Sequence, residues 1–135
     1  MRLEITRRAD LAVRAMTVLG AADGRVKAGD LAAQLHTTAG FVPQVLGPLV
    51  RAGWVRSEPG PAGGYRSMVP LDALSVLEVI EAVDGPTDSG RCVVSDRPCD
   101  DDHPCALHAA WTRARTELIR TLAGTSVAAL TAEAA

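Results

Sequence analysis

The fold of this chain is decided by residues 54–69, which read WVRSEPGPAGGYRSMV. Both ends of this segment, residues 54–58 and 65–69, contain the aromatic and β-branched side chains that favour strands. The six residues between them are only Pro, Gly and Ala, a composition typical of a turn. The segment therefore predicts a two-stranded β-hairpin.

Three helices are predicted before the hairpin, at residues 7–22, 28–36 and 37–52, with Gly53 ending the third. Pro48 lies inside the third helix, where it removes a hydrogen bond, so that helix is expected to bend or to end early. Three helices followed by a hairpin is the order of a winged helix-turn-helix, whose third helix enters the major groove of DNA. The apolar residues repeat at helical spacing: Leu11, Ala15 and Val18; Leu31, Ala32 and Leu35; Phe41, Val45 and Leu49.

Two more helices are predicted after the hairpin. The first covers residues 75–84, because Ser75 and Glu78 form a capping box and Gly85 ends the apolar stripe. The second is a long helix over residues 105–123, followed by a last turn near Thr125. The fold class is therefore mainly α with a small β-hairpin, a winged helix-turn-helix plus a long C-terminal dimerisation helix.

Two domains are expected: a DNA-binding domain at residues 1–70, and residues 71–135 with a helix, a cysteine-rich loop and the dimerisation helix. We expect the long helix to pack against its copy in a symmetric homodimer, since readers of this class usually recognise two half-sites. Packing within one chain is the alternative.

The charge distribution favours DNA as the partner. Residues 1–66 contain nine Lys or Arg and five Asp or Glu, whereas residues 67–135 contain five Arg and eleven acids. A basic half joined to an acidic half suggests a surface for a polyanion, here double-stranded DNA with a partly palindromic operator. The candidate groove residues are Thr38, Phe41, Gln44 and Arg51, and the candidate backbone contacts are Arg7, Arg8, Arg56 and Arg66, with Gly63 and Gly64 in the hairpin turn.

All three cysteines, Cys92, Cys99 and Cys105, lie within 14 positions in a loop rich in Pro and Asp. A disulfide would leave one cysteine over, and such a loop offers no core for buried thiols, so they are interpreted as ligands of one metal centre. His108 follows Cys105 by one helical turn and could be a fourth ligand. Cys and His suit an iron–sulfur cluster or, as an alternative, a structural zinc ion; reactive or incidental thiols are the remaining possibility.

Other function classes are less compatible with the sequence. It has no catalytic triad spacing, no phosphate-binding glycine loop and no paired catalytic carboxylates, so the chain is not expected to be an enzyme. No signal peptide and no apolar run of membrane-spanning length are evident, which favours a cytoplasmic protein that does not associate with membranes.

The chain resembles the Rrf2 family of bacterial winged-helix regulators over nearly its whole length. The resemblance rests on the opening helix around residues 12–16, on Gly60–Tyr65 in the hairpin, on residues 75–84 and on the three cysteines. It implies a transcriptional regulator, expected to be a repressor, whose DNA affinity is controlled by an iron–sulfur cluster. Such a cluster would sense redox state, nitric oxide or iron–sulfur status.

The resemblance offers two candidates for the fourth ligand. His108 matches the histidine that completes a [2Fe-2S] cluster in some members, whereas Asp10 resembles the aspartate that others provide from the partner subunit to a [4Fe-4S] cluster. We favour His108 and [2Fe-2S], because its spacing from Cys105 is local; Asp10 has an ordinary role as an acid in the first helical turn.

Two proline positions depart from the family pattern. Pro43 stands where cluster-binding members carry a base-reading glutamate, and Pro59 stands where they carry an arginine of the wing. The recognised operator is therefore expected to differ from theirs.

Overall fold

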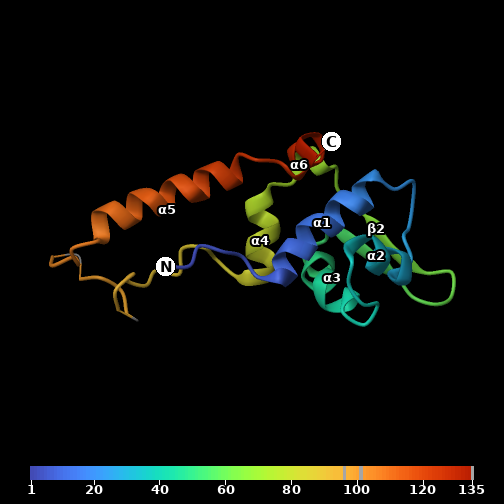
Figure 1. The fold of residues 1–135 in the computed structure, drawn as a ribbon, viewed down its shortest axis with the longest axis horizontal. Coiled ribbons are helices and arrows are strands. Elements are labelled where there is room, and N and C mark those ends of the chain that lie inside the picture. Colours follow the sequence, from blue (N-terminus) through green and yellow to red (C-terminus); the bar gives the residue numbers. More distant parts are fainter. Residues whose placement is uncertain (96, 101, 135) are drawn as a thin grey trace.

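The computed structural model describes residues 1–95, 97–100 and 102–134. It consists mainly of helices with one two-stranded antiparallel hairpin, so the predicted fold class is confirmed. Figure 1 shows a body that contains the hairpin and every helix except one, α5, which extends away from it. The elements are α1 (Arg7–Ala21), α2 (Ala28–Leu35), α3 (Val42–Arg51), β1 (Val55–Glu58), β2 (Gly64–Ser67), the 3-10 helix η1 (Leu71–Ala73), α4 (Val76–Asp84), α5 (His108–Ala123) and α6 (Val127–Ala134).

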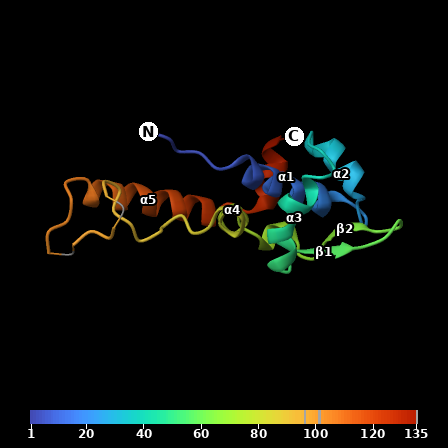
Figure 2. The same cartoon turned by 90° about the horizontal axis from the view of Figure 1, so that it is seen from below.

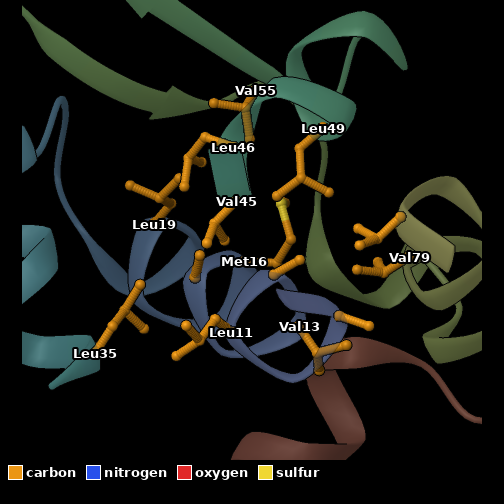
Figure 3. Close-up of a cluster of buried hydrophobic side chains, with 14 of the residues drawn as sticks. Leu11, Val13, Met16, Leu19, Leu35, Val45, Leu46, Leu49, Val55 and Val79 are labelled. Carbon is orange, nitrogen blue, oxygen red and sulfur yellow. The ribbon is translucent and has the colours of Figure 1, made fainter. Parts of the chain in front are cut away.

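Helix α1 lies at the centre of the hydrophobic core. Its side chains Leu11, Met16 and Leu19 are almost fully buried, and Met16 and Leu19 face Leu49 and Leu46 of α3 (Figure 3). Because the chain has few aromatic residues, this core is built from Leu, Val, Ala and Met. The remaining helices of the body add Leu31 and Leu35 from α2, Val79 from α4 and Val127 from α6.

Helix α3 begins later than predicted. Residues 38–41 form a turn, in which the Phe41 N–H donates to the Thr38 carbonyl at 3.0 Å, and the helix starts at Val42. Pro43 explains the late start, because its missing N–H costs nothing in the first helical turn. The helix continues through Pro48 to Arg51, so this proline does not end it early. The prediction of a helix beginning at residues 37–38 was wrong.

The hairpin is held close to the body by an additional β-bridge. Val55 pairs with Ser67 and Arg56 with Arg66 across the two strands. On the other side of β2, Tyr65 and Val26 exchange both backbone hydrogen bonds at 2.8 Å. The segment before α2 therefore runs beside β2 like a third strand. Figure 2 shows α3 and the hairpin on the same side of α1.

Helix α4 has the predicted capping box and is also bonded to the start of α1. The Ser75 hydroxyl accepts from the Glu78 N–H at 3.1 Å, and the Glu78 carboxylate accepts from the Ser75 N–H at 2.8 Å. At its other end, Asp84 accepts from the Thr6 hydroxyl at 2.6 Å and from the Thr6 N–H at 3.2 Å. Thr6 is itself the N-cap of α1, so the last turn of α4 is fixed to the first turn of α1.

The two C-terminal helices differ in their packing. Helix α6 returns to the body, where Val127 is fully buried and its N–H donates to the Leu74 carbonyl at 2.8 Å. Helix α5 begins at His108 rather than at residue 105, and it contains no buried residue. Among the described residues, no helix is both long and apolar enough to span a membrane.

Candidate functional site

The cysteine loop joins the end of α4 to the start of α5, and hydrogen bonds connect its first residues to both helices. The Thr87 N–H donates to the Glu81 carboxylate on α4 at 2.6 Å. One Asp88 oxygen accepts from the Gly90 N–H at 2.9 Å and from the Arg115 guanidinium on α5 at 3.3 Å. The loop therefore starts from a defined position between two helices.

The three cysteines converge, as the sequence predicts. Their sulfur atoms all lie within 4.8 Å of one another, and the Cys99 and Cys105 sulfurs are 3.7 Å apart. All three side chains are half-buried and line one cavity of about 290 Å³, which His108 and Trp111 also line. The fold of the loop thus brings Cys99 and Cys105, which follow Cys92 by 7 and 13 positions, into one site with it.

The loop backbone favours a negative charge on Cys92. The Val94 N–H lies 3.4 Å from the Cys92 sulfur. This contact, with help from Cys99 and Ser95, lowers the pKa of Cys92 to about 6. A backbone hydrogen bond from Cys105 acts to lower the pKa of Cys99, but the contact with Cys92, burial and the nearby Cys105 outweigh it and raise that pKa.

The two candidates for a fourth ligand lie in different places. His108 lines the same cavity as the cysteines, and its N–H donates to the Cys105 carbonyl at 3.1 Å; it is not part of the group of ligand atoms within 4.8 Å. Asp10 lies in the first turn of α1, 3.6 Å from Arg14, and it does not line the cavity of its own chain. Asp10 could therefore take part only as Asp10 of the partner subunit.

The cysteine site has the chemistry of a soft-metal or cluster site. Three converging thiols, one of them with a pKa near neutrality, are donors that suit iron–sulfur clusters, zinc or other thiophilic metals rather than magnesium or calcium. An imidazole in the same cavity is a further possible donor. The donor set fits an iron–sulfur cluster.

The cavity wall includes a charged pair that the sequence did not reveal. Arg115 and Asp88 both line the cavity, and Arg115 is mostly buried, with 22% of its side chain exposed. These residues are 27 positions apart, and Asp88 belongs to an irregular loop. The regular spacing of a helix or a strand therefore could not predict their contact. Only the folded loop places Arg115 beside the three thiols.

The candidate groove residues lie at the turn before α3 and along α3. Thr38, Gln44 and Arg51 are exposed there. Phe41 is half-buried and packs against the core, so part of its ring supports the fold. Gly63 and Gly64 lie where the hairpin turn meets β2, and Arg56 and Arg66 occupy one face of the hairpin.

The two arginines of the first helical turn already bind backbone carbonyls. Arg8 donates to the Val83 carbonyl at 3.0 Å, which ties α1 to the end of α4. Arg7 reaches the His36 carbonyl at 3.5 Å, at the αL residue that ends α2. A guanidinium has five donors, so both arginines can still contact a phosphate, and their role in binding DNA stays a prediction.

Sequence comparison gives a consistent family assignment. Residues 5–133 match the model of the Rrf2 family, described as iron-dependent transcriptional regulators. The chain is 32% identical over 132 residues to a helix-turn-helix transcriptional regulator, ORF2, of Azotobacter vinelandii, covering 96% of this chain and 80% of the relative. It is 30% identical over 130 residues to the regulator IscR of Aliivibrio salmonicida, covering 95% and 77%.

Comparison with solved structures supports the fold. The structure of CymR, the global cysteine regulator of B. subtilis, superimposes with a TM-score of 0.80 and covers 98% of both chains, at 22% identity. At that identity the similarity concerns the fold alone. The relatives named above are regulators, which confirms that this chain is a regulator rather than an enzyme.

Proposed function

This chain belongs to the Rrf2 family of transcriptional regulators, and from this premise we propose that it is a repressor whose DNA affinity is set by an iron–sulfur cluster on Cys92, Cys99 and Cys105. The observation that carries the proposal is the convergence of all three thiols in one cavity beside His108. When bound, such a cluster supplies a redox-active centre that also reacts with small oxidants and nitric oxide.

We assign the fourth ligand to His108, because it lines the cavity within its own chain. A [2Fe-2S] cluster is the corresponding expectation. Asp10 of the partner subunit with a [4Fe-4S] cluster is the alternative, and it requires a dimer that brings α1 of one subunit to the loop of the other. Zinc held by the same residues is a further alternative, in which the loop supports the fold without sensing.

The contacts around the loop supply a route from the cysteines to the DNA-reading helices. Glu81 and Arg115 hold the start of the loop to α4 and α5. Asp84 and the Val83 carbonyl then connect the end of α4 to Thr6 and Arg8 of the first turn of α1. Because α1 forms the core with α3, a change in the loop can shift the reading helix relative to α5.

Helix α5 supplies the argument for a homodimer. It contains no buried residue, although Trp111 and Leu118 lie along its length; Leu122, near its end, packs against the core of its own chain. A 16-residue helix on which Trp111 and Leu118 are only partly buried gains stability by packing against a second copy. A two-fold axis would place two copies of α3 against two half-sites of a partly palindromic operator.

The test is the cofactor content of protein purified without oxygen. We expect a coloured protein with charge-transfer absorption, iron and acid-labile sulfide. Single Cys→Ser changes at positions 92, 99 and 105 should each abolish the colour and leave the far-ultraviolet circular dichroism spectrum unchanged. Ser89→Ala, at an exposed position of the same loop that does not line the cavity, is the matched control and should keep the colour.

Two results would overturn the proposal. A colourless protein that contains stoichiometric zinc would assign the site to a structural metal. Full iron and sulfide content in any one of the three cysteine variants would remove that cysteine from the ligand set.

A further inference from the structure

One face of the hairpin carries a row of arginines drawn from three separate segments of the chain. Arg56 on β1 is directly opposite Arg66 on β2. On the far side of β2, Val26 pairs with Tyr65 in an antiparallel bridge, and continuing that register by one residue sets Arg25 opposite Arg66. Residues opposite one another in an antiparallel pair point to the same face. The row Arg25–Arg66–Arg56 therefore lies across three adjacent segments, about 5 Å apart.

Glu58 is the acid that holds this arginine row together. One of its carboxylate oxygens is 3.5 Å from the Arg25 guanidinium, and the other is 3.9 Å from Nε of Arg66. Glu58 is mostly buried, with 28% of its side chain exposed, whereas Arg25 and Arg66 are about half exposed, at 43% and 45%. No described acid forms an ion pair with Arg56, so the row and Glu58 together carry a charge of about +2.

The row contradicts the usual rule for sheet surfaces. Like charges directly opposite one another destabilise a strand pair. The other face of the hairpin is committed to the core through Val55 and Tyr65, so the arginine face is directed to solvent. An unfavourable charge arrangement on an exposed face points to an anionic ligand that neutralises it, and planar guanidinium groups bind phosphate through two parallel hydrogen bonds.

We infer that Arg25, Arg66 and Arg56 form a clamp for the DNA backbone and that Glu58 is the positioning residue that orients it. This inference rests on DNA binding from the proposed function, but it is independent of the cluster. It adds Arg25, which lies between α1 and α2 and is brought to the hairpin by the Val26 bridge and the ion pair with Glu58, to the candidate contacts. It also means that Glu58, although negatively charged, favours the binding of negatively charged DNA.

The experiment measures the salt dependence of binding to a mixed-sequence DNA duplex by fluorescence anisotropy, with one anaerobic preparation procedure for all proteins. Removing one arginine that binds a phosphate should reduce the slope of log K against log salt by about 0.9. We expect Arg25→Ala, Arg56→Ala and Arg66→Ala each to show this reduction. Arg120→Ala is the matched control: it also removes an arginine that pairs with a glutamate, Glu117, but on α5, far from the hairpin (Figure 1).

The variant Glu58→Gln distinguishes an orienting role of Glu58 from the effect of its negative charge on DNA binding. This change makes the protein more positive by one unit, so a purely electrostatic effect would tighten DNA binding. If Glu58 orients the row, Glu58→Gln instead weakens DNA binding several-fold. In a protein that already carries Arg25→Ala, Glu58→Gln should weaken DNA binding by a smaller factor than it does in the parent protein. Thermal melting of each variant serves as the folding check, and Arg25→Gln replaces Arg25→Ala if the latter melts early.

The outcomes are distinct. A parent-like slope for Arg25→Ala would overturn the clamp, and equal or tighter binding by Glu58→Gln would overturn the role of Glu58. A parent protein that binds no DNA at any salt concentration would overturn the proposed function and this inference together. If protein purified without oxygen contains no iron or sulfide but its DNA binding still depends on these arginines, the clamp is supported and only the cluster is contradicted.

Discussion

At position 63 the backbone has room for a hydrogen atom and nothing larger. A Cβ placed on Gly63 would lie 2.0 Å from the Glu58 carbonyl oxygen, which belongs to the end of β1. Backbone atoms cannot turn away as a flexible side chain can, so the strands themselves would have to separate. The glycine is required by the close approach of the two hairpin strands.

Gly63→Ala should therefore destabilise the protein by about 1–3 kcal/mol, the usual cost of forcing an extra carbon into a packed site. Gly29→Ala is the matched control, because nothing lies within 4 Å of a Cβ there and the residue is in α2. The control should gain about 0.5–1 kcal/mol from helix propensity. Urea denaturation measures both, and equal stability of the two variants would contradict the steric account.

Cys92 should be the most reactive thiol of the metal-free protein. Its pKa of about 6 means that the thiolate predominates at pH 7 and is lost as the pH falls through 6. Cys99, whose pKa is raised, should stay protonated over the same range. We expect alkylation by iodoacetamide, followed by peptide mass spectrometry, to modify Cys92 first and with a midpoint near pH 6. Faster modification of Cys99 at neutral pH would show that the loop backbone does not stabilise the Cys92 thiolate.

Among the elements, α4 has the strongest local signal, and it is hydrogen-bonded both to the start of α1 and to the cysteine loop. Its capping box fixes its start, and Gly85, with a φ of 89°, ends it. Between these ends, Val79 is buried in the core, and the last turn bonds to the start of α1. The helix therefore connects the core to the cysteine loop, and its stability should affect both.

Ser75→Ala should lower the free energy of unfolding by about 1 kcal/mol, because the Glu78 N–H loses its side-chain acceptor. Ser57→Ala, at an exposed position of β1, is the control and should stay within about 0.5 kcal/mol of the parent. Chemical denaturation gives both values. A change at Ser75 no larger than at Ser57 would mean that tertiary packing alone holds the first turn of α4.

In the whole molecule, the body is connected to the extended α5 by the cysteine loop on one side and by α6 on the other. Ligation of the three cysteines would fix the loop, and with it the position of α3 relative to α5. A physiological switch needs affinities that differ at least about tenfold between the two states, or about 1.4 kcal/mol of coupling. The same coupling requires bound DNA to change the stability of the cluster by an equal factor.

Titration of one DNA duplex with cluster-loaded and cluster-free protein, at identical salt and without oxygen, tests this coupling. We expect the two dissociation constants to differ by about tenfold or more, and sedimentation to show a dimer in both states. Equal affinities would leave a metal that merely supports the fold. A monomer at micromolar concentration would contradict the two-fold arrangement on DNA.

The sequence by itself determined the order of the helices and the hairpin, because the signals involved are local. Apolar residues at helical spacing, the Ser75–Glu78 box and the Gly- and Pro-rich turn each act over a few residues, and the structure confirms these elements. The clustering of the cysteines within a short loop also limited how far apart their sulfurs could lie, and the structure brings them together.

Only the tertiary structure decided which distant side chains meet. Arg25 joins the arginine row because Val26 pairs with Tyr65, 39 positions away, and Arg115 reaches the cysteine cavity because Asp88 holds it from across the loop. The start of α3 was likewise set by Pro43 together with the burial of Val42, against a plausible earlier cap at Thr38. Contacts of this kind depend on packing between elements. Such packing produces no regular spacing of residue types in the sequence, so it could not be predicted from the sequence.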